Sequence, residues 1–150
     1  MGAAEVGRLA ALAPRLEQWC DELASAGLPL TVQHDDLHMG SVYENGGRLR
    51  ILDWGDCSIS HPFFSLVVTF RFLEERSGLD PDDQWFLRLR DAYLEPWGTD
   101  LEEVFELAIR VGRFAHLIGW SRHRGILRAT ERAAFDSWFA HVIRRTLEAD

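Results

Sequence analysis

The middle of the chain concentrates residues that could carry out metal-assisted phosphoryl transfer. His34, Asp36, His38 and Ser41 lie within eight positions, and Asp53 follows twelve residues after Ser41. Phosphoryl transfer needs a carboxylate that accepts a proton from the attacking hydroxyl, and oxygen ligands that hold magnesium against the phosphates. We therefore expect Asp36 to act as the base and Asp53 to bind Mg²⁺.

The spacing of these residues supports that assignment. His34, Asp36 and Ser41 follow the pattern His-x-Asp-x-x-x-x-Asn of a kinase catalytic loop, with serine replacing the asparagine, and Asp53 stands where the downstream metal carboxylate is expected. Asp56 is either a secondary metal ligand or a hydrogen-bond acceptor in its own loop.

A predicted hairpin brings the two carboxylates together. Two β-prone runs flank Glu44–Gly47, and asparagine and glycine tolerate the positive φ of a tight turn. The turn is centred on Asn45-Gly46 or on Gly46-Gly47, and either register returns Asp53 to the loop that carries Asp36. The sequence therefore predicts a convergent acidic cluster.

Most of the remaining chain has helical periodicity, so the predicted fold class is α+β, mostly helical, with a small β insert. At 150 residues and 47% hydrophobic content we expect a single domain over 1–150. Trp85, Trp120 and Trp138 are expected in the core. Helices are expected over residues 1–12, 13–26, 61–76, 101–121 and 130–147, with Pro14 as a break between the first two and Gly78 closing the third. A further helix is expected to begin at Asp80–Asp83 and to have Trp85, Leu89 and Tyr93 on its inner face.

Composition limits the classes of partner. A net charge of −8 does not favour a protein that neutralises nucleic-acid phosphates, and no apolar run is long enough to cross a membrane. Cys20 and Cys57 show no metal or disulfide spacing, so we expect reduced, buried thiols in a cytoplasmic protein. All sixteen basic residues are arginine, and the chain contains no lysine.

The segments HDDLHMGSV, ILDWGD and HPFF resemble the aminoglycoside phosphotransferase and choline-kinase-like family. The usual family loop is HGDLHPGN, which His34, Asp36, Leu37, His38 and Gly40 match. The resemblance implies a protein-kinase-like C-terminal lobe that uses ATP and Mg²⁺ to phosphorylate the hydroxyl of a small molecule. It also implies that Asp36 is the base, that Asp53 and Ser41 bind the metal, and that His34 and His38 support the loop through hydrogen bonds.

Two differences from the family pattern affect what we expect of this chain. Ser41 offers a hydroxyl where the family has an amide carbonyl, which predicts weaker or water-mediated metal binding. No Gly-rich phosphate loop precedes His34, and the absence of lysine excludes a lysine–glutamate nucleotide clamp. We therefore expect the N-terminal nucleotide-clamping lobe to be absent, so that the chain is a fragment, a split enzyme or an inactive relic, with an N-terminal-lobe partner or a homodimer as options.

Two other functions remain open. A lobe without catalysis would be a binding or regulatory protein. His34, Asp36 and His38 occupy alternate positions, so on a strand they would share one face and could bind the metal of a phosphohydrolase. Such an enzyme would need a further histidine upstream, and residues 1–33 contain none. Trp97 and a group of acidic residues could attract a cationic substrate, but a solvated acidic surface is the simpler interpretation. The acidic residues are Glu74, Glu75, Asp80, Asp82 and Asp83.

Overall fold

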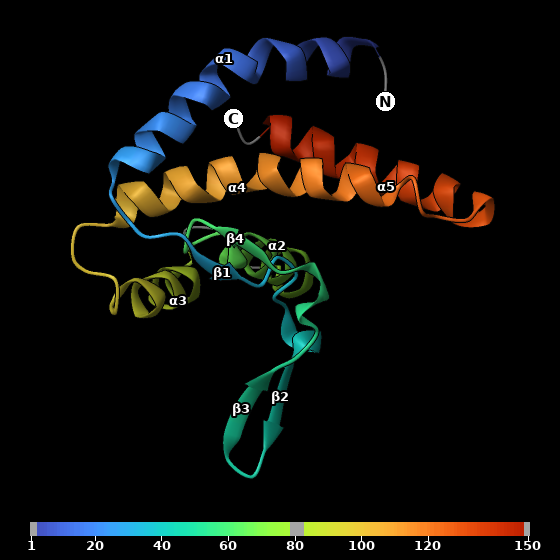
Figure 1. Ribbon diagram of the computed structural model, residues 1–150. Coiled ribbons are helices and arrows are strands. Elements are labelled where there is room, and N and C mark those ends of the chain that lie inside the picture. Colours follow the sequence, from blue (N-terminus) through green and yellow to red (C-terminus); the bar gives the residue numbers. More distant parts are fainter. Residues whose placement is uncertain (1–2, 79–82, 149–150) are drawn as a thin grey trace. The chain divides into compact units, whose positions relative to one another are not determined.

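The computed structural model describes residues 3–78 and 83–148, which are mostly helical with two small pairs of antiparallel strands (Figure 1). This confirms the predicted α+β, mostly helical composition. The elements are α1 (Ala3–Ser25), β1 (Thr31–Gln33), β2 (Val42–Asn45), β3 (Arg48–Ile51), β4 (Ser58–Ser60), α2 (Ser65–Ser77), α3 (Gln84–Leu94), α4 (Glu102–His123) and α5 (Ala129–Glu148), with short 3₁₀ turns at Met39–Ser41 and Trp54–Asp56.

The chain divides into two compact units, and the division falls inside α4. The helical unit consists of α1, the part of α4 from Arg110 onward, and α5. The site unit consists of residues Gly27–Ile109 and contains every residue predicted to act in phosphoryl transfer. Each unit is described separately below.

In the helical unit, the predicted break at Pro14 is wrong, because α1 continues through that residue. A proline inside a helix lacks the N–H that would bond to the carbonyl four residues earlier, and it commonly bends the helix. Figure 1 shows α1 changing direction along its length. Burial of Trp19 and Leu23 on the following turns holds the helix together beyond this point.

In the site unit, aromatic side chains form the core. Phe63 is fully buried, and its ring lies 5.9–6.1 Å from the rings of Tyr93, Trp97 and Phe105. The Tyr93 hydroxyl also donates a hydrogen bond to the Pro62 carbonyl at 2.6 Å. These contacts join the start of α2 to α3 and α4, and they give Trp97 a packing role.

The burial predicted for two tryptophans and for both cysteines is wrong. Trp85 is 63% exposed and Trp138 is 40% exposed, whereas Trp120 is half-buried. Phe86 is buried in place of Trp85 because one residue turns a helix by about 100°, so a one-residue error in phase is enough to move a side chain off the inner face. Cys20 and Cys57 are free thiols as expected, but both are exposed.

Helix boundaries agree with the capping pattern where the structure describes them. Gly78 ends α2 with φ of 66°, a left-handed conformation that glycine adopts without strain. Asp83 caps α3 by accepting a hydrogen bond from the Trp85 amide at 2.8 Å. The remainder of the predicted helix start, Asp80–Asp82, lies outside the described residues. The segment His61–Phe64 forms a turn, so α2 begins later than predicted.

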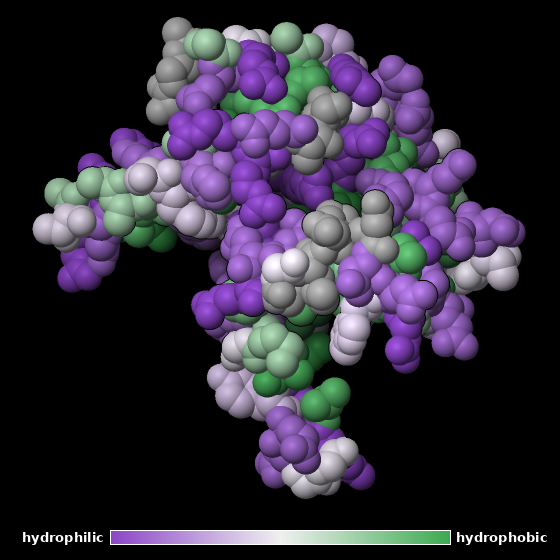
Figure 2. Space-filling model, turned by 180° about the vertical axis from the view of Figure 1, so that it is seen from behind, coloured by the Kyte–Doolittle hydropathy of each residue, from purple (hydrophilic) through white to green (hydrophobic). Residues whose placement is uncertain are grey.

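The hairpin is confirmed, with its turn on Gly46-Gly47. Val42 pairs with Ile51, and both turn glycines have positive φ, as a two-residue hairpin turn requires. The Asn45-Gly46 register is therefore wrong. Figure 2 shows apolar side chains exposed beside polar ones on this hairpin, and Leu49 is 75% exposed.

Strand β4 was not predicted from the sequence. It pairs antiparallel with β1 and has a single apolar residue, Ile59, which is 75% exposed. Strands are recognised in a sequence by apolar residues that alternate and point inward, whereas here the apolar residue is the one that points outward. The buried residue of the pair of strands is Gln33, whose side chain supports the predicted site.

Candidate active site

The predicted catalytic loop begins with a buried polar anchor on α2. The backbone amide of His34 donates a hydrogen bond to the Ser65 hydroxyl at 2.9 Å. The Ser65 hydroxyl and amide donate to the side-chain carbonyl of Gln33 at 2.7 and 3.2 Å. All three residues are buried. Because unsatisfied buried donors cost about 1–3 kcal/mol each, this network fixes the position of the loop relative to α2.

The His34 ring joins the loop to the strand that leads to Asp53. Its Nδ1 accepts a hydrogen bond from the Asp36 amide at 3.3 Å, so in the neutral ring the proton lies on Nε2, which donates to the Leu52 carbonyl at 2.8 Å. The edge of the ring contacts Trp54 with centroids 4.9 Å apart. Both ring nitrogens are therefore used in holding the site together.

Asp36 combines a fixed backbone with an accessible carboxylate. Its amide is held by the His34 ring, while its side chain remains 45% exposed. The Oδ2 atom lies 3.6 Å from His38 Nε2, which is beyond hydrogen-bond distance. A group with this geometry can approach a substrate hydroxyl without first breaking a strong hydrogen bond.

The second half of the loop is closed by a capping box. His38 Nδ1 accepts a hydrogen bond from the Gly40 amide at 2.9 Å, and the Ser41 hydroxyl accepts one from the His38 amide at 3.0 Å. The His38 ring also stacks on Phe72 with centroids 5.0 Å apart. An added Cβ at Gly40 would lie 2.7 Å from His38 Cε1, so a larger residue there would force the His38 ring to shift.

Ser41, the predicted second metal ligand, is only 4% exposed. Its hydroxyl donates to the His38 carbonyl at 2.8 Å while accepting from the His38 amide. To bind a metal ion, Ser41 would have to give up part of this network. The geometry favours a structural use of the hydroxyl, and the role as a metal ligand remains a prediction.

Asp53 and Asp56 lie at the 3₁₀ turn Trp54–Asp56 that follows β3, in a different setting. Both residues are exposed, and Asp53 has φ of 66° and ψ of 54°, a left-handed conformation that is uncommon for a residue other than glycine. The Asp53 side chain makes no capping hydrogen bond. Within residues 3–78 and 83–148, no three histidine, cysteine or carboxylate side chains converge as a ready-made metal cage.

His61 lies just before α2 and has a strongly shifted pKa. Its Nδ1 accepts a hydrogen bond from the Phe63 amide at 3.4 Å, and its buried Nε2 has no partner among the described residues. Burial lowers the pKa of His61 to about 4, because the charged ring would lose its hydration. His61 is therefore neutral at pH 7 and belongs to the support of α2.

Apart from His34 and His38, sequence reasoning did not identify the residues that hold the loop. Ser65 and Thr69 are four residues apart on α2, and the Thr69 hydroxyl donates to the Leu37 carbonyl at 2.8 Å. Two hydroxyl residues at this spacing share one helix face. Because the segment is otherwise apolar, this pair of hydroxyl residues was the one feature of the sequence that could have indicated a polar contact with the loop. Nothing in the sequence pointed to Gln33 or Phe72.

Comparison with known protein families identifies the chain. The model of the phosphotransferase enzyme family matches residues 2–107, so the chain belongs to that family. This confirms the resemblance to aminoglycoside phosphotransferases and choline kinases. No curated protein and no solved structure matches the chain significantly.

Among the described residues, none of the helices is both long enough and apolar enough to span a bilayer.

Proposed function

We propose that the site unit is the catalytic half of a small-molecule kinase that transfers the γ-phosphoryl group of ATP to a substrate hydroxyl. The observation that carries this proposal is the Asp36 geometry: its amide is held by a partly buried hydrogen bond, the preceding His34 amide by a buried one, and its carboxylate stays accessible. Positioning is most of what phosphoryl transfer asks of a protein. Asp36 then orients the attacking hydroxyl and accepts its proton.

The donor set near the hairpin base is compatible with magnesium. Mg²⁺ prefers oxygen ligands, keeps several waters and is commonly held by one or two carboxylates together with substrate phosphates. Asp53 supplies an exposed carboxylate of this kind, and its left-handed backbone is a strained conformation of the sort found at functional sites. When bound, the ion would neutralise charge on the phosphate oxygens. Asp53 would hold it, with Ser41 and Asp56 as further candidate ligands.

The groups that bind the nucleotide phosphates would lie outside these 150 residues. A kinase usually contacts the phosphates through a Gly-rich loop and a lysine, and the sequence has no lysine. We therefore propose that the chain works together with an N-terminal lobe, as one polypeptide or as a partner. The acceptor is a small hydroxyl compound, and a cationic acceptor suits the sixteen acidic residues of the site unit.

The test is the substitution Asp36→Asn in the enzyme that carries both lobes, measured as ADP released on addition of acceptor. Turnover should fall by at least about 100-fold, because general-base catalysis contributes roughly 10²–10⁴. Asp35→Asn is the matched control, since it removes the same charge one residue earlier. Equal activity of Asp36→Asn and the wild-type enzyme would reject the assignment.

A binding or regulatory function is the second candidate, and the Ser41 geometry favours it. The hydroxyl that replaces the usual amide ligand is buried and engaged by His38. A lobe that has lost one metal ligand could keep its fold without catalysis. Calorimetry with Mg²⁺–ATP on the two-lobed protein separates the candidates, because this alternative predicts no magnesium-dependent binding.

The phosphohydrolase alternative has little support from the loop geometry. Both ring nitrogens of His34 are engaged and Nδ1 of His38 accepts a hydrogen bond from the Gly40 amide, so of these four nitrogens only His38 Nε2 lacks a hydrogen bond to the described residues. A histidine that binds a metal needs a free ring nitrogen. A tightly bound transition metal found by elemental analysis of the purified protein would reopen this function.

A further inference from the structure

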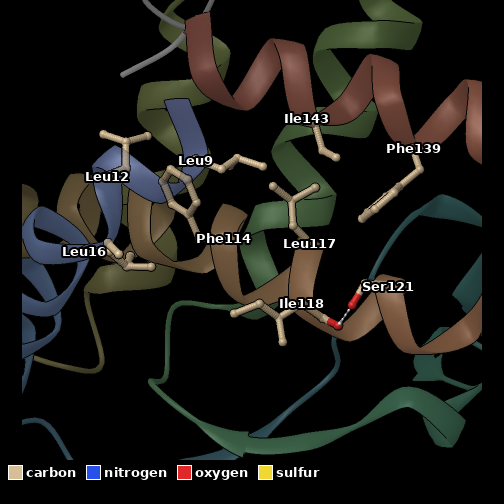
Figure 3. A pocket seen from close by; sticks show the side chains of 10 residues that line it. Leu9, Leu12, Leu16, Phe114, Leu117, Ile118, Ser121, Phe139 and Ile143 are labelled. Atoms are coloured by element: carbon tan, nitrogen blue, oxygen red, sulfur yellow. Dashed lines mark hydrogen bonds between the residues drawn. The ribbon is translucent and has the colours of Figure 1, made fainter. Parts of the chain in front are cut away.

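An apolar groove of about 320 Å³ lies within the helical unit, to which all of its lining residues belong (Figure 3). α1, α4 and α5 all contribute to its lining, which includes Leu9, Leu16, Phe114 and Phe139. Its one hydroxyl side chain, Ser121, donates to the Ile118 carbonyl at 2.7 Å within α4. The groove therefore presents apolar surface without polar groups that would orient a polar ligand.

The lining residues of each helix recur three or four positions apart, which is the spacing of side chains on one face of a packed helix. On α1 they extend from Leu9 to Leu16, and on α4 from Phe114 to Ser121, so each stripe spans eight positions, a rise of about 10 Å along the helix. Three amphipathic helices with such stripes form part of a bundle. The open position beside them has the length and shape for about two turns of another helix.

The charges around the groove indicate which kind of helix would fit. Residues 110–148, which supply α5 and the later part of α4, contain eight arginines and three acidic residues, whereas the third lining helix, α1, contains two arginines and four acidic residues. Arg110 lies one turn before Phe114, and Arg132 lies two turns before Phe139, so both positions continue the groove-facing stripes. These segments also lie beyond residues 2–107, which the family model matches.

We propose that this groove binds an acidic amphipathic helix of a partner protein. The apolar face of that helix would cover the groove, and its acidic residues would face the arginine-rich flanks of α4 and α5. Electrostatic complementarity of this kind selects among partners more than it adds raw affinity. Because the groove is separate from Asp36 and Asp53 in sequence and in structural unit, the inference does not depend on the proposed kinase activity.

The experiment uses the full 150-residue chain and a fluorescent, covalently stapled helical peptide of about two heptads. Leucines occupy the positions that face the groove, and glutamates occupy the remaining positions. Fluorescence anisotropy should report saturable binding in the micromolar range. The same peptide with lysines in place of the glutamates should bind at least about tenfold more weakly, because it places like charges together.

Substitutions in the protein test whether binding occurs in the groove. Leu9→Glu places a charge inside it, and Ile118→Glu does so at its rim, where the wild-type side chain is 53% exposed and folding is less at risk. Each should weaken binding at least about tenfold. Ile126→Glu is the matched control, because Ile126 is 80% exposed and is not part of the lining, and it should leave the affinity unchanged.

Four outcomes would overturn the proposal. The first is no binding of the glutamate peptide, and the second is equal binding of both peptides. The third is an affinity that Leu9→Glu and Ile118→Glu leave unchanged in folded variants. The fourth is a wild-type dimer in sedimentation that Ile118→Glu dissociates, which would identify a second copy of the chain as the occupant.

Discussion

The loop of Asp36 and the turn of Asp53 carry the two carboxylates of the proposed site, yet they are built differently. The loop is held by one buried and two partly buried hydrogen bonds, in which Ser65 and the His34 ring accept from loop amides and Thr69 donates to a loop carbonyl. The turn is exposed, and Asp53 adopts a left-handed conformation with no capping hydrogen bond from its side chain. The difference teaches that the proposed base is positioned in advance, whereas the proposed metal carboxylate awaits the ion and phosphates that would satisfy it.

The largest effect should come from relaxing the Asp53 turn. In Asp53→Gly, the left-handed conformation no longer strains the backbone, so the stability to urea should rise by up to about 1 kcal/mol. Turnover of the two-lobed enzyme should nevertheless fall by at least about 100-fold, because the proposed magnesium carboxylate is gone. An active variant would contradict the role of Asp53 in binding magnesium. A variant less stable than the wild type would contradict the claim that the turn is strained.

Acid should weaken the support behind the loop. His61 has a pKa of about 4 in the folded protein and an ordinary value near 6.5 when unfolded, so the unfolded state binds the proton first as pH falls. Stability should therefore decrease from pH 6.5 to 4, by at most about 3 kcal/mol from this residue. Urea unfolding across this range should show a shallower pH dependence in His61→Asn. Identical slopes in the two proteins would contradict the account.

A smaller effect is expected from the anchor on α2. Ser65→Ala leaves the buried His34 amide without its acceptor, which should cost about 1–3 kcal/mol of unfolding free energy. Ser25→Ala is the control, because that hydroxyl bonds to the Glu22 carbonyl at an exposed position. In the two-lobed enzyme Ser65→Ala should lower kcat more than it raises KM. Equal stability of the two variants would show that the anchor does not hold the loop.

The contrast between loop and turn also explains which features the sequence could reveal. The hairpin, the cap at Asp83 and the end at Gly78 depend on local chemistry, so residue types predicted them. The Ser65–Gln33 anchor and strand β4 depend on contacts between segments about thirty residues apart, which no local pattern encodes. The exposed Trp85 shows the same limit, because one residue of helical phase decides burial.

The site residues divide in a similar way. The positions of Asp36 and Asp53 in a known spacing were sufficient to suggest their chemistry. The use of the Ser41 hydroxyl by His38 was hidden, because a serine in that position could equally face a metal ion. Packing of the loop against Phe72 and α2 determines the choice, and packing is not written in the motif.

The measurement that tests the central claim most directly is the magnesium dependence of turnover in Asp36→Asn and Asp53→Asn, made in the two-lobed enzyme with ATP saturating. The account predicts that Asp36→Asn lowers kcat at every magnesium concentration without shifting the midpoint. Asp53→Asn should shift the midpoint to higher magnesium by at least about tenfold. A shifted midpoint in Asp36→Asn, with an unshifted one in Asp53→Asn, would contradict the division between base and metal carboxylate.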